Sequence, residues 1–199
     1  MDSVNSKTRQ RILRVALKIF AECGYEGASV QAIVDAARVT KPTLYYYFKS
    51  KAALFQSLID LAHDERYRLM GEAAALGTTL EQRLIEVLAT LFDFINGNRA
   101  LMRIAFGTAF AAKGEIPREI LYLPKAERNF EFVHQMIQQG LSEGALRRGF
   151  SSRQLTMGIF GMMTIKVMEH LVHGRPRLSR QDAEGIVRLY LEGAGSSAT

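Results

Sequence analysis

The chain has 199 residues, of which 48% are hydrophobic, with 26 Lys and Arg against 20 Asp and Glu and a formal net charge of +6. This composition is typical of a globular protein with a buried core and excludes an intrinsically disordered chain. The single cysteine excludes an intramolecular disulfide and a multi-cysteine zinc site, which fits a reducing cytoplasm.

The positive charge is concentrated at the N-terminus. Residues 1–51 hold nine basic and four acidic side chains, a net charge of +5, whereas residues 52–199 carry +1. The N-terminus has no apolar signal core, and the most apolar stretch, 155–172, is interrupted by Lys166 and Glu169, so we expect neither export nor a membrane span. We expect a cytoplasmic protein with a basic domain over residues 1–51 and a nearly neutral domain over residues 52–199.

Apolar residues recur at helical spacing along most of the chain, and no alternating segment bounded by turn residues appears, which predicts an all-α fold. Gly24 is expected to end the first helix, because glycine tolerates a left-handed cap. Ser29 and Thr40 are positioned to cap the next two helices, and Ser50 opens a longer fourth one. These three helices are predicted over residues 30–37, 40–48 and 50–76.

Five further helices are predicted over residues 79–95, 100–112, 118–141, 152–172 and 180–191. The breaks between them are rich in glycine, asparagine and proline. Pro124 is expected to end or kink the segment 118–141, because proline has no N–H to donate within a helix.

The segment 28–51 predicts a helix-turn-helix arrangement, in which two short helices pack on a longer preceding helix. The second short helix of such an arrangement enters the DNA major groove. The side chains expected to face inward are Ile33, Ala37, Val39, Leu44 and Phe48. Lys41, Thr43 and the tyrosines at 45–47 then lie on or near the outer surface.

Three adjacent tyrosines beside lysines suit a DNA groove. A tyrosine hydroxyl can bond a phosphate while its ring packs on sugar or a thymine methyl group. Lys51, in the first turn of the following helix, could clamp a phosphate together with the free amides there. Arg9, Arg11 and Arg14 either add phosphate contacts or are simply solvated. The alternative for the whole cluster is that the tyrosines pack on the rest of the protein and the lysines form a solvated face.

The run Lys-Pro-Thr-Leu-Tyr-Tyr-Tyr-Phe-Lys-Ser-Lys at residues 41–51 resembles the TetR family of transcriptional regulators, and the resemblance extends over roughly residues 7–55. It implies an all-helical homodimer, with an N-terminal three-helix helix-turn-helix domain and a C-terminal helical domain for effector binding and dimerisation. The implied function is a repressor that binds a palindromic double-stranded DNA operator and is released by a small, largely apolar effector. Positions that commonly contact DNA in that family correspond to Ser29, Thr40, Lys41, Thr43, Tyr45, Tyr46, Tyr47 and Lys51.

The sequence departs from the family pattern at three positions. Arg38 stands where glycine or asparagine is usual at the turn, and a left-handed backbone there is uncommon for arginine. Ala52 replaces the usual acidic residue, and Pro42 stands where glycine is frequent. We expect these changes to alter operator choice or local geometry rather than the fold.

Bulky aromatic and methionine side chains in the C-terminal domain can line an adaptable apolar cavity, or they can form plain core. The candidates for an effector cavity are Leu88, Phe92, Met102, Phe106, Phe110, Phe130, His134 and Met163. His134 can orient a ligand through a hydrogen bond, and the alternative is a surface or internally satisfied histidine.

The last two helices are the expected dimer interface. Gly158 and Gly161 would allow close approach of a second helix, and Ile186, Leu189 and Tyr190 would supply apolar area. The alternative is that these residues complete the core of a monomer.

No catalytic motif appears, so we expect no enzymatic activity and no cofactor. His170 and His173 lie three apart without a matching carboxylate or cysteine, so no metal site is expected either. The alternative function is a protein whose basic N-terminal domain binds nucleic acid or a membrane surface without responding to a ligand.

Overall fold

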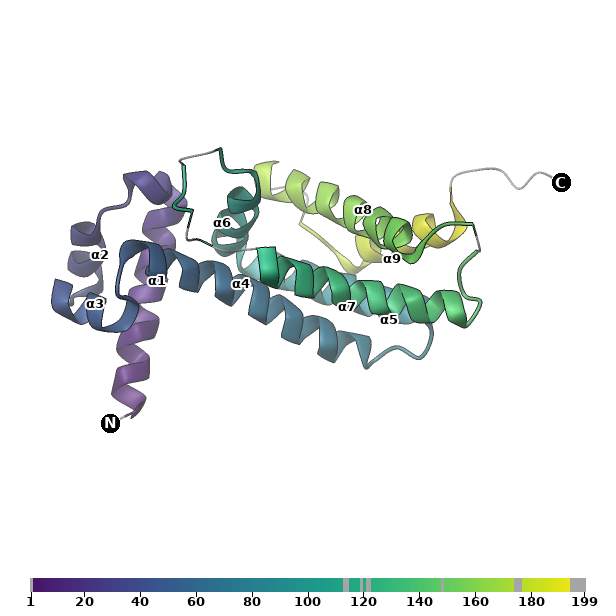
Figure 1. Cartoon of the computed structure of the whole chain (residues 1–199), viewed down its shortest axis with the longest axis horizontal. Coiled ribbons are helices and arrows are strands. Elements are labelled where there is room, and N and C mark those ends of the chain that lie inside the picture. Colours follow the sequence, from purple (N-terminus) through teal and green to yellow (C-terminus); the bar gives the residue numbers. More distant parts are fainter. Residues whose placement is uncertain are drawn as a thin grey trace. The chain divides into compact units, whose positions relative to one another are not determined.

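The computed structural model describes residues 2–112, 115–118, 120, 123–147, 149–173 and 177–193. Within these residues the fold consists of helices, as the all-α prediction requires, and no β-sheet is formed (Figure 1). The helices are α1 (Asp2–Gly27), α2 (Val30–Ala37), α3 (Lys41–Phe48), α4 (Lys51–Ala74), α5 (Leu80–Gly97), α6 (Arg99–Phe110), α7 (Leu123–Ser142), α8 (Ser152–His173) and α9 (Arg180–Glu192).

The short helices α2 and α3 begin where their caps predict. The Ser29 hydroxyl accepts a hydrogen bond from the Ala32 amide at 3.0 Å, and the Thr40 hydroxyl accepts one from the Thr43 amide at 3.3 Å. Both caps satisfy amides that have no partner inside the helix, so two eight-residue helices become stable in place. The predicted bounds of both helices are therefore confirmed to within a residue.

Two helix ends bear on the prediction. The helical backbone of α1 is interrupted at Gly24, where φ is 72°, as expected, and a further short helical stretch extends α1 to Gly27. α7 begins at Leu123 rather than at residue 118, and Pro124 occupies its second position. A proline there removes no helical hydrogen bond, because first-turn amides have no acceptor within the helix. The predicted start of this helix was wrong, and Pro124 neither ends nor kinks it.

The chain divides into two compact units. Unit 1 comprises Met1–His63 and Arg99–Lys125, and unit 2 comprises Asp64–Asn98 and Ala126–Thr199. Helix α4 therefore contributes to both units, and α6 belongs with the N-terminal helices. The predicted functional boundary between residues 51 and 52 falls within unit 1 and stays a proposal about function.

The core of unit 1 fixes α2 and α3 against α1 and the first half of α4. The predicted inward side chains Ile33, Ala37, Leu44 and Phe48 are buried, and Val39 is half-buried. Aromatic rings join α1 to α4: the centroids of Phe20 and Phe55 lie 4.9 Å apart in an edge-to-face contact, and those of Tyr25 and Phe55 lie 5.2 Å apart. This packing holds α3 at a fixed angle to its supporting helices.

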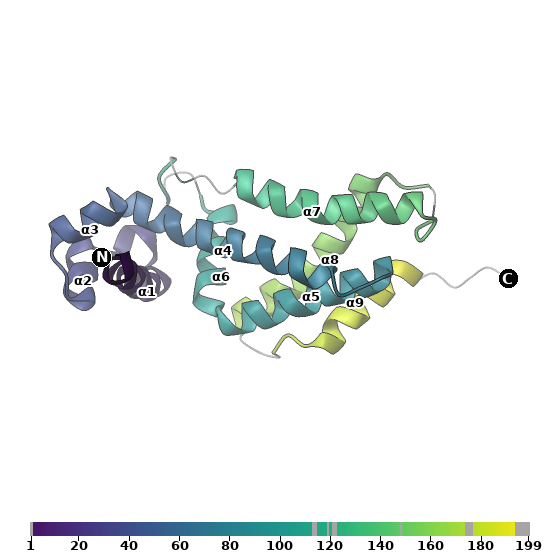
Figure 2. The same cartoon turned by 90° about the horizontal axis from the view of Figure 1, so that it is seen from below.

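In unit 2, α9 packs on α5 and α8 (Figure 2). The Asn96 side chain at the end of α5 bridges both backbone groups of Leu178, donating to its carbonyl at 2.7 Å and accepting from its amide at 3.1 Å. Lys166 of α8 pairs with Asp182 of α9 at 2.9 Å. Burial opposes ionisation of Asp182, but hydrogen bonds from Ser179 and Lys166 outweigh it and lower the pKa of the carboxyl.

Among the described residues, α8 is the one helix long and apolar enough to cross a bilayer by length and composition, with a mean hydropathy of 1.3. One third of its most apolar window is buried within the fold. A core or interface helix of a soluble protein meets the same test, so this property does not by itself indicate a membrane.

Candidate nucleic-acid interface and effector cavity

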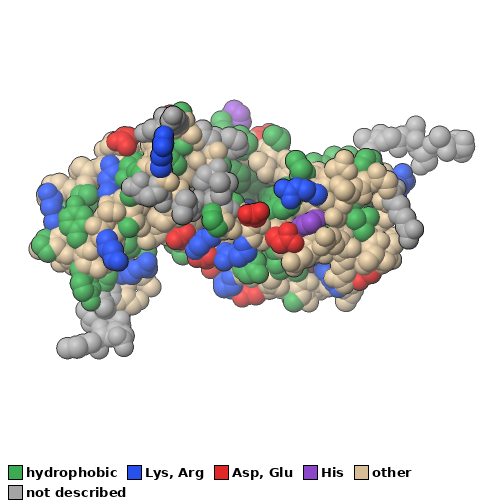
Figure 3. Space-filling model, in the orientation of Figure 1, with side chains coloured by type: hydrophobic (Ala, Val, Ile, Leu, Met, Phe, Trp, Pro, Cys, Tyr) green, Lys and Arg blue, Asp and Glu red, His purple; other side chains and the backbone are tan. Residues whose placement is uncertain are grey.

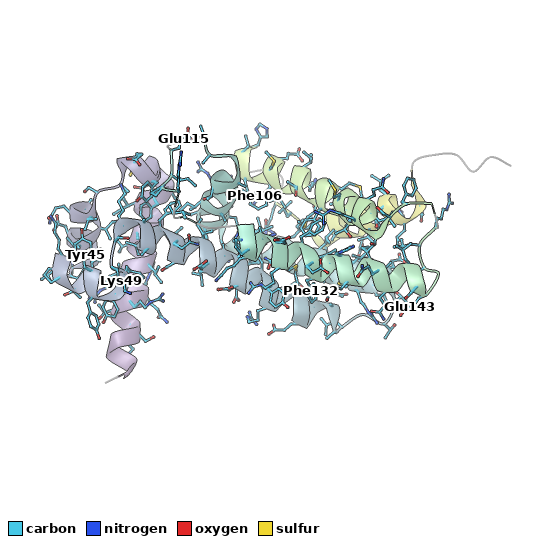
Figure 4. The ribbon with its side chains drawn as sticks, in the orientation of Figure 1. Tyr45, Lys49, Phe106, Glu115, Phe132 and Glu143 are labelled. Carbon is cyan, nitrogen blue, oxygen red and sulfur yellow. The ribbon has the colours of Figure 1, made fainter. Side chains whose placement is uncertain are left out.

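The outer face of α3 presents tyrosines to solvent. Tyr46 is 74% exposed and Tyr45 is 42% exposed, whereas Leu44 and Phe48 are buried beneath them. The half-buried Tyr47 ring supports Tyr46 in an edge-to-face contact with centroids 5.1 Å apart. Figure 4 shows Tyr45 on this helix and Lys49 directly after its last residue. Large aromatic side chains held out from a rigid helix are suited to a groove rather than to a core.

The surroundings of α3 are basic. Lys41 and Lys49 are exposed on or beside the helix, and Arg11 and Arg14 are exposed on α1. The Arg9 guanidinium lies 5.1 Å from the centroid of the Phe48 ring, which places this cation beside the end of α3. On the face seen in Figure 3, basic side chains predominate over acidic ones around α1–α3. Such a distribution favours a polyanionic partner.

Three of the predicted DNA-binding hydroxyl residues lie at helix starts. Ser29 and Thr40 are exposed but serve as N-caps of α2 and α3. The hydroxyl oxygens of Thr40 and Thr43 lie 2.9 Å apart and form a hydrogen bond. These residues therefore have a defined structural task, and any contact that they make with DNA is additional to it.

Lys51, at the start of α4, forms hydrogen bonds with backbone carbonyls at and just after the end of α1. Its ammonium donates to the Ala28 carbonyl at 2.9 Å and to the Glu26 carbonyl at 3.5 Å, and it lies 4.4 Å from the centroid of the Tyr25 ring. An ammonium has three donors, so one N–H remains for a phosphate. The predicted phosphate clamp stays a prediction, and the geometry adds a structural role for the same side chain.

The turn between α2 and α3 has the left-handed backbone that the sequence predicted for Arg38. Its φ and ψ are 51° and 52°, and its amide caps the end of α2 through the Asp35 carbonyl. The side chain is exposed, so no described packing contact explains the choice of arginine. Left-handed backbone costs a residue with a Cβ about 1–2 kcal/mol.

Replacement of Arg38 with glycine is expected to raise the free energy of unfolding by about 1 kcal/mol, because glycine adopts this backbone without a clash. The melting temperature should rise by about 2–4 °C, the shift typical for a chain of this length. Arg38→Ala is the matched control, since it removes the same side chain and charge but keeps the Cβ. Equal melting temperatures for the two variants would contradict the assignment of backbone strain.

The eight candidate effector residues fall in both units. Leu88, Phe92, Phe130, His134 and Met163 belong to unit 2, and Met102, Phe106 and Phe110 belong to unit 1. Phe92 and Met102 are fully buried, Phe106 and Phe130 are half-buried, and the Phe110 side chain lies outside the described part.

Two of these candidates, Leu88 and Met163, meet on one apolar cavity of about 10 Å³ in unit 2. The cavity is also lined by Met70, Val87, Leu91, Val133, Ile159 and Phe160. This volume holds at most about one water molecule, so the side chains that line the cavity must move before an effector can bind. A narrow seam between α4, α5, α7 and α8 is therefore an apolar site in the described part of unit 2.

His134 fits the alternative of an internally satisfied histidine. Its Nε2 lies 2.8 Å from the Ser152 hydroxyl, and its Nδ1 lies 3.2 Å from a carboxylate oxygen of Glu131. Both ring nitrogens therefore have partners: Glu131 lies on the same helix, α7, and Ser152 joins His134 to the start of α8. The neighbouring Phe130 ring contacts Phe160 with centroids 5.3 Å apart.

Sequence reasoning missed a set of buried polar side chains in unit 2. Arg66 of α4, Asn129 of α7, and Thr156 and His170 of α8 are all buried. Burial lowers the pKa of Arg66 to about 10, so the guanidinium stays charged at neutral pH. The sequence did hold a signal for the burial of Arg66: Ala62, Arg66 and Met70 are spaced four residues apart and therefore share the buried face of α4.

An exposed apolar stripe runs along α8 and onto α9. Met157, Ile165 and Val172 of α8 are 61%, 69% and 71% exposed, and Leu189 of α9 is 50% exposed. Tyr190 packs over Gly158, its ring 3.8 Å from the position that a Cβ would occupy there, and burial raises the pKa of Tyr190 to about 12. Several large apolar side chains exposed on two neighbouring helices are a candidate interaction surface.

Among the described residues, no group of three or more His, Cys, Asp or Glu side chains could hold a metal ion.

Comparison with known proteins agrees with this geometry. Residues 12–58 match the family model for bacterial regulatory proteins of the tetR family. The HTH-type regulator YdgC of Bacillus subtilis is 27% identical over 176 residues, which cover 86% of this chain and 82% of YdgC. The HTH-type transcriptional activator FasR of Mycolicibacterium smegmatis is 24% identical over 180 residues, 90% of this chain and 80% of FasR.

A solved structure shares the fold over nearly the whole chain. FadR from Bacillus subtilis, crystallised in complex with stearoyl-CoA, matches with a TM-score of 0.82 and 21% identity, covering 94% of this chain and 99% of FadR. The N-terminal match spans the helix-turn-helix described above, and the structural match extends through the C-terminal helices. Residues 12–58 therefore match the helix-turn-helix domain of the tetR family, and the chain is similar to HTH-type transcriptional regulators over most of its length.

Proposed function

We propose that this protein is a homodimeric repressor that binds a palindromic operator through α3 and leaves it when a small, largely apolar effector binds in unit 2. The observation that carries the proposal is the rigid presentation of Tyr45 and Tyr46 beside exposed lysines, above a buried Leu44 and Phe48. The predicted DNA contacts are those of Ser29, Thr40, Lys41, Thr43, Tyr45, Tyr46, Tyr47 and Lys51.

The dimer forms through the apolar stripe of α8 and α9. A C2 pair uses the same patch on both copies, so one stripe of Met157, Ile165, Val172 and Leu189 is sufficient. Gly161 has open space at its Cβ position, which permits close approach of the second copy. Two copies present two recognition helices, which matches the symmetry of a palindromic operator.

The effector enters the apolar seam lined by Leu88 and Met163. Support comes from two observations: this seam is lined wholly by apolar side chains, and a protein of the same fold was crystallised with stearoyl-CoA. Fatty-acyl thioesters are therefore the first class to test. An effector acts only through different affinities for the DNA-bound and free conformations, so opening the seam must change the conformation that binds DNA.

Footprinting of the promoter region upstream of the protein's own coding sequence tests the proposal. We expect protection of a palindrome, and release of that protection by stearoyl-CoA but not by free CoA, because the acyl chain supplies the apolar surface. Stronger protection on adding the thioester would instead identify an activator, the role in the name of FasR.

The alternative is a basic domain that binds nucleic acid without sequence preference. Salt titration separates the two, because phosphate contacts alone weaken equally with salt for the operator and for a scrambled duplex. Equal affinity for the two duplexes at every salt concentration would overturn the repressor proposal.

A further inference from the structure

Unit 1 contains a cavity that the proposed effector seam does not account for. It has a volume of about 510 Å³, compared with about 10 Å³ for the seam in unit 2. Its walls come from the end of α1, the last turns of α6 and the segment around Glu115, and Phe55 of α4 completes it. This volume lies in the range of pockets that hold small organic ligands.

The cavity is electrostatically suited to a cation. Glu22, Glu26 and Glu115 line it, against the guanidinium of Arg103 and the Lys51 ammonium beside the Tyr25 ring, so the carboxylates outnumber the cations. Figure 4 shows Glu115 beyond the end of α6. The C-terminal ends of two helices also meet here, and each such end carries about half a negative charge from its unpaired carbonyls. Neither α1 nor α6 has a basic residue in its last turn to offset that charge.

The base of the cavity is aromatic. Phe20, Tyr25 and Phe55 line it and contact one another. Tyr25 makes a cation–π contact within the protein, because the Lys51 ammonium lies 4.4 Å from the centroid of its ring. Aromatic rings attract organic cations through their negatively charged faces and supply apolar area at the same time. Aromatic rings and carboxylates on one cavity are together suited to an organic cation.

We infer that this cavity is a second ligand site, separate from the effector seam, and that it takes an amphipathic organic cation with an apolar or aromatic body. The carboxylates and helix ends select the charge, and the rings of Phe20 and Phe55 receive the apolar part. A ligand here touches α1 and α6 together. Because α1 supports α2 and α3, occupancy holds the DNA-binding helices in one position relative to α6. This consequence rests on the proposed function, whereas the binding site does not.

The test compares two rigid probes of the same shape and opposite charge, tetraphenylphosphonium and tetraphenylborate, by isothermal titration of the full-length protein without DNA. We expect the cation to bind at least about tenfold more tightly than the anion at this site, a difference of about 1.4 kcal/mol. Equal affinities, or no binding of the cation, would overturn the inference even if footprinting confirmed an operator.

Gly107 provides the variant that localises the site. It lines the cavity on α6, and a Cβ built there meets nothing within 4 Å, so a larger side chain has room to grow into the space. Gly107→Leu is expected to weaken cation binding at least about tenfold without unfolding the protein, since leucine also favours a helix. The matched control is Gly71→Leu on α4, where the Cβ position is likewise open.

The carboxylates are tested separately with the double variant Glu22→Gln and Glu26→Gln, which preserves side-chain shape. We expect this variant to bind tetraphenylphosphonium several-fold more weakly and to bind tetraphenylborate no more weakly than the unmodified protein does. Cation binding that is unaffected by both Gly107→Leu and the double variant places the probe elsewhere and refutes the site.

Discussion

Tyr46→Ala is expected to weaken operator binding by roughly 100-fold at constant salt. Tyr46 is 74% exposed, more than Tyr45 on the same helix, and a hydrogen bond from its hydroxyl to a phosphate is worth about 1.5 kcal/mol in each copy. The dimer makes the contact twice, so about 3 kcal/mol is lost, which corresponds to roughly two orders of magnitude in Kd. Fluorescence anisotropy with a labelled operator measures the change.

Two further variants resolve how Tyr46 acts. Tyr46→Phe keeps the ring and removes the hydroxyl, so it separates the phosphate contact from ring packing in the groove. Leu76→Ala removes a side chain that is 73% exposed in the segment between α4 and α5, outside the proposed DNA-binding surface, and should leave affinity unchanged. Unchanged operator affinity in the Tyr46→Ala, Lys51→Ala double variant would exclude the proposed recognition surface altogether.

Ile165→Asp is expected to convert the dimer to monomers at micromolar concentration and to abolish measurable operator binding. Ile165 is 69% exposed at the middle of the α8 stripe, so the isolated chain tolerates a carboxylate there. In a C2 dimer the same substitution buries two carboxylates against apolar side chains. We expect the dimer to lose about 4 kcal/mol, roughly a thousandfold in its dissociation constant. Sedimentation equilibrium measures the change.

Leu76→Asp is the matched control for the dimer, since it adds the same charge at an equally exposed leucine outside α8 and α9. At a protein concentration low enough to dissociate the unmodified dimer, both variants should melt at the same temperature as the unmodified protein. A dimeric Ile165→Asp variant would show that α8 does not form the interface.

The helix-turn-helix was predictable from sequence because each of its determinants is local. Ser29 and Thr40 cap their helices within three residues, and the spacing of Ile33, Ala37, Leu44 and Phe48 sets the buried faces. The left-handed turn at Arg38 was also predictable, since the family pattern demands a residue that tolerates positive φ. The start of α7 was not predicted, because Pro124 was interpreted as an interruption within a longer helix. Proline is equally compatible with the first turn, and Pro124 occupies the second position of α7.

The candidate sites were predictable only in part. Tyr45 and Tyr46 of α3 are exposed and Tyr47 is half-buried, because helical periodicity separates these tyrosines from the buried Leu44 and Phe48. The effector candidates were chosen by residue type, and side chains of one type serve equally as core or as cavity lining. Leu88 and Met163 line one cavity, and which candidates do so depends on which faces of α4, α5, α7 and α8 meet.

The sequence by itself therefore determined most of the helix positions, the basic character of residues 1–51 and the resemblance to TetR regulators, because charge, caps and periodicity act over a few residues. Only the tertiary structure decided which partners distant side chains find. In the folded chain the Lys51 ammonium donates to the Ala28 carbonyl, the His134 ring lies at hydrogen-bond distance from the Ser152 hydroxyl, and Arg66 is buried in unit 2. The tertiary structure also brought the ends of α1 and α6 around one cavity. These outcomes depend on packing between segments far apart in the chain, which no local pattern specifies.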